Sequence, residues 1–231
     1  MAWKKAVALF GATGPTGRHI IEEALKRGYT LSVYTRDAKK LASFAGRIEI
    51  VVGDLQDQSA IIEIVVGDLQ DQSAIAKCVQ GADAVISALG PNGLKVQGDK
   101  PVMHGLSNII VAMQRAGVRR LIQISTAAYR DPKDSFAFKP HAFALLFEVI
   151  ARKGYEDIKA TGELVANSNL DWTLVRIPNL KDGPADGSVD VGWYGTTKLG
   201  MTLSRGNLAK FLVDQVTDRK FVRAAPGIAN H

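Results

Sequence analysis

Short apolar runs alternate along the chain with longer segments in which apolar residues recur at helical spacing. The runs predict strands, and the spaced segments predict helices. Because strands joined through helices pair in parallel, the pattern predicts a doubly wound α/β fold of the Rossmann type, with a mostly parallel sheet in the order 3-2-1-4-5-6-7. The expected strands are 6–10, 31–35, 82–88, 119–125, 172–176 and 221–224, plus one from a duplicated segment, and the expected helices are 18–28, 70–80, 104–116, 204–216 and a segment from about residue 142.

The first predicted strand runs directly into a glycine-rich turn, and a helical segment follows at once. The turn reads GATGPTG, with glycines at Gly11, Gly14 and Gly17. In a dinucleotide site one glycine lets the chain turn sharply, one lets backbone N–H groups approach the pyrophosphate, and one lets the helix pack closely on the strand. The helix N-terminus then offers unpaired N–H groups to phosphate. A nucleotide cofactor is therefore expected at the three glycines and at the turn residues Thr13, Pro15 and Thr16, with an ordinary βα turn as the alternative.

The spacing G-x-x-G-x-x-G resembles the short-chain dehydrogenase/reductase superfamily in its extended and atypical branches. The likeness is closest over residues 162–191, where the acidic Glu163 precedes a strand that ends in Arg-x-Pro and an Asp-Gly-Pro loop. From Ala6 to about Val216 the chain is most similar to the biliverdin-IXβ/flavin reductase-like and NmrA-like groups. This resemblance implies that Arg176 lies near the active site and Pro178 beside the nicotinamide ring.

The turn after the 82–88 strand is expected to line the diphosphate and ribose of the cofactor, through Ala88, Leu89 and Gly90. Arg36 is the first residue after the apolar run of the second strand. An arginine at this place favours the 2′-phosphate of NADP, whereas an acidic residue favours the ribose hydroxyls of NAD. We therefore expect NADP(H) rather than NAD(H), with Asp37 as the alternative ribose contact.

Residues 48–61 and 62–75 have the same sequence, IEIVVGDLQDQSAI. Each copy holds a strand, a Gly-Asp-Leu turn and the start of a helix, but a parallel sheet has one place beside its second strand. The resemblance implies that one such unit forms the third strand and that its Asp-Leu turn flanks the adenine. The second copy keeps its helix contiguous, so we expect it in the sheet, with Asp68 and Leu69 at the adenine. The first copy in the sheet is the alternative.

Three residues are candidates for catalysis. Ser125 ends the 119–125 strand, where short-chain dehydrogenases keep a catalytic serine or threonine. Tyr155 and Lys159 match Y-x-x-x-K, and residues four apart share one face of a helix. In such a pair the lysine stabilises a phenolate and holds the nicotinamide ribose, while the tyrosine transfers a proton to or from a carbonyl oxygen. The resembled groups often lack the full set, so a surface helix with one half-buried ring is the alternative.

Composition limits the classes of partner. The net charge of +6 is spread over scattered basic pairs without aromatic interleaving, which favours an anionic cofactor over nucleic acid. No run reaches a membrane-spanning length, so no membrane partner is expected. The single cysteine, Cys78, excludes an internal disulfide and indicates a reducing, cytoplasmic location. We expect one domain over 1–231, as a monomer or homodimer, without a metal site and with small substrate-side elements from 129–154 and 180–203.

These features predict an NADPH-dependent oxidoreductase that reduces a small planar acceptor of the flavin, tetrapyrrole or quinone type. Four phenylalanines in the 129–154 connection either wall a flat substrate or bury the connection, namely Phe136, Phe138, Phe143 and Phe147. One alternative is a carbonyl reductase or epimerase that uses Ser125, Tyr155 and Lys159. The other is a non-catalytic NADP(H)-binding sensor or assembly factor.

Overall fold

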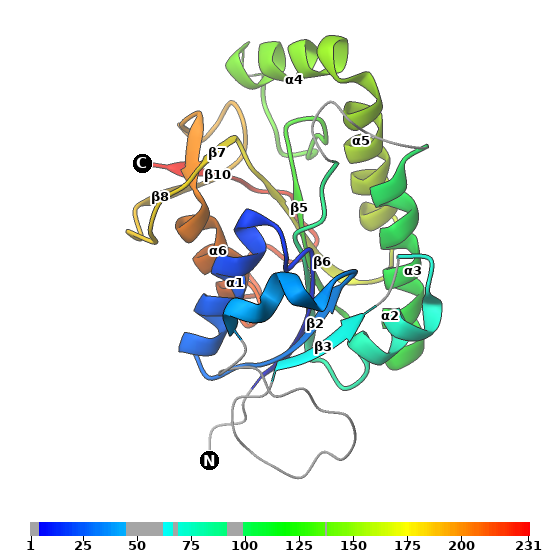
Figure 1. Cartoon of the computed structure of the whole chain (residues 1–231). Helices are drawn as coiled ribbons and strands as arrows, with labels where there is room; N and C mark the ends of the chain where they lie inside the picture. The colour runs from blue at the N-terminus through cyan, green and yellow to red at the C-terminus, as the bar shows by residue number, and fades with distance from the viewer. Residues whose placement is uncertain (1–4, 45–61, 67–68, 92–98, 137) are drawn as a thin grey trace.

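A mostly parallel sheet forms the centre of the molecule in the computed structural model (Figure 1). The structure describes residues 5–44, 62–66, 69–91, 99–136 and 138–231. Eight strands lie in the order β3-β2-β1-β4-β5-β6-β10-β8, in which every neighbouring pair is parallel except β10 with β8. The predicted α/β fold with a mostly parallel sheet is thus confirmed.

The elements are bounded as follows: β1 Ala6–Phe10, α1 Pro15–Lys26, β2 Thr30–Thr35, the 3-10 helix η1 Ala38–Phe44, β3 Ile62–Val66, α2 Gln72–Val79, β4 Ala84–Ser87, α3 Pro101–Ala116, β5 Arg120–Ser125, α4 Phe138–Ile150, α5 Arg152–Ala166, β6 Asp171–Arg176, β7 Asn179–Lys181, β8 Val189–Gly192, β9 Thr202–Ser204, α6 Arg205–Asp214 and β10 Gly227–Asn230. The short strands β7 and β9 pair with each other in a separate two-stranded sheet.

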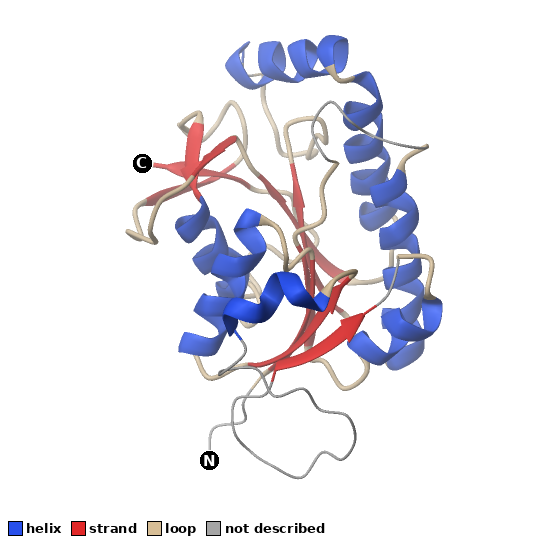
Figure 2. Cartoon of the chain, viewed as in Figure 1, coloured by secondary structure: helices blue, strands red, loops and turns tan. Residues whose placement is uncertain are grey.

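Helices cover both faces of the large sheet (Figure 2). Helices α1 and α6 pack together on one face, and α2, α3 and α5 pack together on the other. Strand β1 shows how the sequence serves both layers, because successive side chains of a strand point to opposite faces. Val7 and Leu9 enter the core shared with α1 and α6, whereas Ala8 and Phe10 enter the core shared with α2 and α3. Both faces being buried explains why this run is continuously apolar.

Strand β3 comes from the second copy of the duplicated sequence. Ile62–Val66 pairs in parallel with β2, with Val66 opposite Thr35. Helix α2 follows β3 in the same copy, and the Asp71 side chain caps it by accepting hydrogen bonds from the N–H groups of Ser73 and Ala74. The first copy, 48–61, lies outside the described residues.

The C-terminal part of the chain differs from the prediction. The expected last strand, 221–224, is a turn in which Ala224 alone makes a β-bridge, to Thr173. The strand that lies beside β6 is β10, in the tail from which no element was predicted. Its four residues, GIAN, carry too short an apolar pattern to predict a strand. Its place is set by its neighbours β6 and β8, which are distant in the sequence.

Candidate functional site

The glycine turn joins β1 to α1, and its three glycines meet three different constraints. Gly11 has a φ of +82°, and a Cβ there would lie 2.8 Å from the backbone carbonyl carbon of Ala88 at the end of β4. A Cβ on Gly17 would overlap the carbonyl oxygen of Gly11 and lie 2.5 Å from the Cα of Ala12. A Cβ on Gly14 would meet just one atom, at 3.4 Å. Gly11 and Gly17 are therefore needed by the fold, whereas Gly14 leaves open space over the turn.

The N-terminus of α1 has the features of an anion site. Gly14 is the N-cap and Pro15 follows it, so neither a capping side chain nor an acidic residue of the first turn occupies the helix end in the described structure. The first N–H groups of a helix and its dipole favour an anion at such an end. Thr16 and Gly17 are buried in the first turn, and Thr13 is half-buried just before it. The turn thus fits a phosphate group at its open side.

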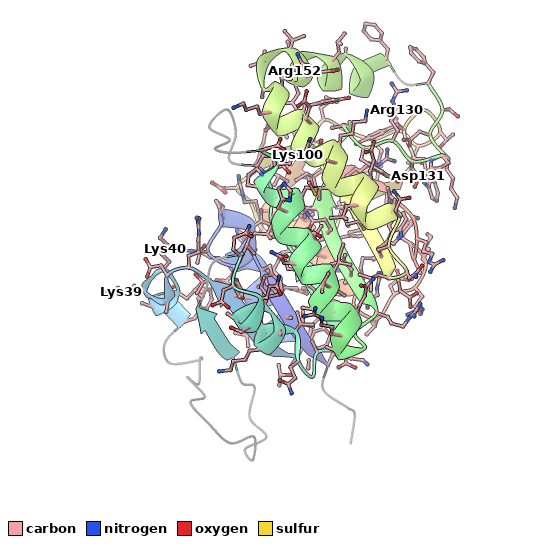
Figure 3. All side chains as sticks on the ribbon, turned by 90° about the vertical axis from the view of Figure 1, so that its right-hand side faces the viewer. Lys39, Lys40, Lys100, Arg130, Asp131 and Arg152 are labelled. Carbon is pink, nitrogen blue, oxygen red and sulfur yellow. The ribbon has the colours of Figure 1, made fainter. Side chains whose placement is uncertain are left out.

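A corner of basic side chains lies where β2 ends. Arg36 and Lys40 are exposed there, and Arg18 on α1 donates a hydrogen bond to the Lys40 carbonyl oxygen at 3.3 Å. Figure 3 shows Lys39 and Lys40 together at the edge of the molecule. The Asp37 carboxylate instead accepts a hydrogen bond from the backbone N–H of Lys39 at 3.0 Å. Arg36 thus reaches solvent at this corner, while Asp37 is engaged in starting η1.

A cavity of about 530 Å³ opens at the carboxyl ends of β4, β5 and β6. Ligands of doubly wound sheets bind at this edge, near the point where the strand order reverses. Most of the wall is apolar, and the volume lies within the range of small-molecule sites. The lining residues are Leu89, Gly90, Pro91, Val102, Gln123, Ile124, Ser125, Thr126, Ala127, Ala128, Phe147, Ile158, Thr161, Ile177, Pro178, Asn179, Leu180 and Arg205. Four of the predicted site residues, Leu89, Gly90, Ser125 and Pro178, are thus brought together.

Three polar side chains in this wall are buried and retain an oxygen without a hydrogen-bond partner in the described part of the chain. They are Ser125 (Oγ), Thr161 (Oγ1) and Gln123 (Oε1), each at most 5% exposed. The Gln123 amide nitrogen is held by the carbonyl oxygens of Leu89 and Ile124. A buried polar atom without a partner is costly in a folded protein, and polar groups in an apolar pocket fix the orientation of a ligand. These three residues are the buried polar part of a mostly apolar wall.

Helix α5 turns a different face toward the cavity from the one that Y-x-x-x-K suggests. Ile158 and Thr161 line the cavity, whereas Lys159 is exposed and does not. Tyr155 is half-buried and reaches the cavity wall indirectly, with its ring edge-on to Phe147 at 6.4 Å between centroids. Asp157 is fully buried and accepts the N–H groups of Val102 and Met103 at 3.1 and 2.9 Å.

Asp157 therefore anchors α5 to the first turn of α3 and sets the rotation of the helix. Asp157 and Thr161 were not among the predicted site residues. A helical stripe was nevertheless visible: Ile158, Thr161 and Val165 follow at spacings of three and four residues, and all three are buried. This stripe indicates the buried face of the helix, and it contains Thr161.

Arg176 lies at the end of β6 but does not line the cavity. Its side chain is fully buried and makes a bidentate ion pair with Asp134, with 2.8 Å between Nη2 and Oδ1. The guanidinium stacks on the Tyr194 ring at 4.4 Å, and the Tyr194 N–H also donates to Asp134. Burial raises the pKa of the Tyr194 hydroxyl, while Arg176 opposes that shift. Arg176 thus joins the 129–135 and 193–195 segments beside the cavity rather than presenting its charge within it.

A second, smaller cavity of about 460 Å³ lies beside the glycine turn. Its lining residues are Thr13, Pro15, Arg18, His19, Glu22 and Asp182. Asp182 forms an ion pair with Arg205 at 2.7 Å, and Arg205 lines the larger cavity. The pair therefore lies between the two cavities and connects the glycine turn to the apolar site.

The remaining predicted cofactor contacts are Leu69, Asp68 and Ala88. Leu69 and Ala88 line neither of the two cavities described above. Leu69 is half-buried against α3: its carbonyl accepts from the Asn108 side chain at 2.8 Å, and its side chain fills the space left by Gly105. Asp68 lies outside the described residues. The Ala88 N–H donates a hydrogen bond to the carbonyl oxygen of Phe10, the last residue of β1 and the one before Gly11.

Within the described ranges, no group of three or more His, Cys, Asp and Glu side chains is placed to hold a metal ion. Over the same residues, the helices fall short of the length and apolar content needed to cross a bilayer.

The sequence profile of a family described as NAD(P)H-binding matches residues 11–63 and 58–219. Each of the two matches takes in one complete copy of the duplicated segment. An uncharacterized protein of Arabidopsis thaliana, described as chloroplastic, is 27% identical over 92% of this chain and 70% of that protein.

Two solved structures share the fold. A short-chain dehydrogenase/reductase of Veillonella parvula in complex with NADP is 18% identical over 99% of this chain and 95% of that one, with a TM-score of 0.75. ChuY, an anaerobillin reductase from Escherichia coli O157:H7, is 17% identical over 98% of this chain and 97% of that one, with a TM-score of 0.68. The glycine turn, the parallel sheet and the family match agree, and the chain belongs to the NAD(P)H-binding family.

Proposed function

We propose that the protein is an NADPH-dependent oxidoreductase that reduces a small, planar, electron-poor acceptor of the flavin, tetrapyrrole or quinone type. One observation carries the proposal: an apolar cavity at the carboxyl edge of the sheet holds buried Ser125 and Thr161 hydroxyls without partners in the described residues. The cavity is connected to the glycine turn through Arg205 and Asp182. A cofactor held at the turn would thus extend toward a site suited to an aromatic ligand.

The residues present fit the cofactor. The open side of Gly14 and the uncapped first turn of α1 would hold the diphosphate. Ala88, Leu89 and Gly90 follow β4 beside the turn, and Pro178 lines the apolar end. When bound, the nicotinamide supplies a hydride, and the acceptor also takes up one proton, which balances a two-electron reduction.

NADPH is favoured over NADH by the corner at the end of β2. The exposed Arg36 lies near Lys40 and Arg18, where a phosphate would gain charge-assisted hydrogen bonds. One oxygen of the Asp37 carboxylate, the alternative ribose contact, accepts the Lys39 N–H. A corner in which basic side chains outnumber the one acid suits the 2′-phosphate of NADPH.

The shape of the acceptor follows from the cavity wall. Phe147, Ile158 and Ile177 offer flat or branched apolar surface, which suits the faces of a conjugated ring. Ser125 and Thr161 would donate hydrogen bonds to carbonyl oxygens at the ring edge, where negative charge develops as the ring accepts a hydride. The fold shared with an anaerobillin reductase supports a tetrapyrrole within this class.

The carbonyl reductase alternative retains Ser125 in the cavity, but it also needs Tyr155 and Lys159 at the reacting atoms. Lys159 is exposed on the other side of α5 from the cavity lining, and this favours the planar acceptor. A cytoplasmic location is also part of the proposal, supported by the single cysteine, Cys78, which is buried and forms no disulfide, as suits a reducing compartment.

The test is NADPH oxidation by the purified protein with FMN, a linear tetrapyrrole, a naphthoquinone and a small ketone. We expect turnover with at least one of the first three, and at least about tenfold lower kcat/KM for Thr161→Val, with little change in NADPH affinity. Thr161→Ser, which restores the hydroxyl, should recover much of the loss. Turnover of the ketone alone would support the carbonyl reductase, and tight NADPH binding without turnover would support the sensor.

A further inference from the structure

Helix α4 presents an apolar surface to solvent. Leu145 is 62% exposed and Val149 is 76% exposed, and Phe138 at the start of the helix is 75% exposed. Surface helices of globular proteins normally place charged and polar residues on the outer face. This one has the reverse arrangement over the side chains that the structure describes, and contiguous exposed apolar patches mark interaction sites.

The exposed residues share one side of the helix. At about 100° per residue, positions seven and four apart fall on the same side, which places Phe138, Leu145 and Val149 in one stripe. Leu146 and Ile150 flank it at 55% and 59% exposure. Phe147 points the opposite way and lines the apolar cavity. Phe138, Leu145 and Val149, here called the outer stripe, therefore stay exposed although the opposite side of the helix faces the protein.

The surroundings of this outer stripe are mainly basic. Arg130 lies on the segment before α4, and Arg152 and Lys153 begin α5 directly after it, all three exposed. The Lys133 ammonium lies over the Trp193 ring, at 4.8 Å from its centroid. Figure 3 shows Arg130 and Arg152 at the end of the molecule where α4 lies. Arg152 is paired with Glu156, and Glu148 is the exposed acid on α4 itself. Asp131 and Asp134 are turned inward, toward Ala225 and Arg176.

We propose that the outer stripe of α4, with its basic surroundings, docks on the surface of an anionic lipid membrane. An interfacial helix buries apolar side chains at the boundary between headgroups and acyl chains, while nearby lysines and arginines bind anionic headgroups. This geometry leaves Phe147 facing the cavity. The sequence offered no membrane partner because it has no spanning segment, but docking on a surface needs no spanning length.

A second copy of the chain is the other candidate occupant, and the charges oppose it. A two-fold contact through α4 would bring Arg130 and Lys153 of both copies to the same interface. Like charges placed across an interface oppose association. One helix face also supplies few residues compared with the roughly 20–30 a side of a stable interface. A lipid surface provides both the apolar layer and the opposite charge.

The experiment is sedimentation of the full chain with vesicles of phosphatidylcholine alone and of phosphatidylcholine with phosphatidylglycerol. We expect binding to the anionic vesicles, weaker binding to the neutral ones, and at least about tenfold weaker binding for Leu145→Glu/Val149→Glu. Arg130→Gln/Lys153→Gln should weaken binding to anionic vesicles several-fold and reduce its dependence on salt. Val111→Glu, a partly exposed apolar site on α3, is the matched control and should bind as the unchanged chain does.

Circular dichroism and the thermal unfolding midpoint establish that each variant is folded. Equal vesicle binding by the unchanged chain and by Leu145→Glu/Val149→Glu would overturn the proposal, as would the absence of binding to anionic vesicles. Sedimentation equilibrium distinguishes the other occupant. A dimer that Leu145→Glu/Val149→Glu converts to monomer, without vesicle binding by either, would assign the stripe to a second copy.

Discussion

Asp134 holds the buried guanidinium of Arg176 through both carboxylate oxygens and accepts the Tyr194 N–H with one of them. The pair joins the end of β6 to the segment before α4 and to the segment after β8. Arg176 is fully buried and the Asp134 side chain is 12% exposed, so removal of one partner leaves a charge with little access to water. The elements that border the cavity are thus tied together behind it.

Replacing one partner of this pair should destabilise the protein strongly. We expect Asp134→Ala to lower the free energy of unfolding by about 3–5 kcal/mol, because it leaves the Arg176 charge buried and unpaired. Arg176→Met/Asp134→Leu, which removes both charges, should lose less than the single variant. Urea unfolding measures both, and a loss below about 1 kcal/mol for Asp134→Ala would show that the pair does not hold these segments.

The glycines of the turn should separate binding from folding. Gly14→Val should abolish NADPH binding with little change in stability, because its side chain would enter the open side of the turn. Gly17→Val should lower the thermal unfolding midpoint, because its side chain would overlap the backbone of Gly11 and Ala12. Calorimetric titration and thermal unfolding measure the two effects. NADPH affinity unchanged in Gly14→Val would place the cofactor elsewhere.

Arg36 should decide the choice of cofactor. We expect Arg36→Ala to weaken NADPH binding by roughly 1–3 kcal/mol, which is the loss of a charge-assisted pair, and to change NADH binding little. Arg115→Ala, an exposed arginine at the end of α3, is the control for the loss of one surface charge. Titration with both cofactors provides the comparison. An equal loss for NADPH and NADH would favour Asp37 as the ribose contact.

The catalytic candidates give distinct expectations. If Tyr155 transfers a proton, Tyr155→Phe should lower kcat by about 100-fold or more with little change in cofactor affinity. Because Tyr155 contacts Phe147 rather than the cavity, we expect a smaller effect, below about tenfold, and a larger one for Ser125→Ala. Steady-state kinetics with the best acceptor from the panel measures both. A larger loss of kcat in Tyr155→Phe than in Ser125→Ala would show that Tyr155 acts at the reacting atoms.

The cap of α2 should make stability depend on acid pH. Hydrogen bonds from the Ala74 N–H and the Ser73 side chain lower the pKa of Asp71 in the folded chain. The carboxylate therefore stabilises the fold above the unfolded pKa near 4, and this contribution is lost as pH falls through the lower folded pKa.

We expect Asp71→Ala to melt below the unchanged chain from pH 7 to 5, with the gap closing as pH falls below about 4. Asp57 has the same position in the first copy, and Asp57→Ala is the matched control. The two melting curves across this pH range provide the measurement. Equal effects of both variants would mean that either copy supplies the helix.

The unit from β1 to α1 was readable from the sequence because its determinants are local. An apolar run, a glycine with positive φ, a proline at the first helical position and the helical spacing all act within neighbouring residues. The N-cap of α6 rests on an equally local contact, since the Ser204 hydroxyl accepts the Asn207 N–H three residues later. The cofactor class followed from the same local unit and from the family resemblance.

Tertiary structure decided between segments with identical local sequence, and it set side-chain directions that no local pattern indicates. The two copies of IEIVVGDLQDQSAI have the same propensities, and pairing with β2 places the second one in the sheet. The direction of Lys159 depends on Asp157, which binds α3, an element about fifty residues away in the chain. The burial of Arg176 likewise depends on Asp134, and the strand at β10 depends on β6 and β8. Each of these outcomes rests on contacts between distant segments, whose energy no local pattern contains.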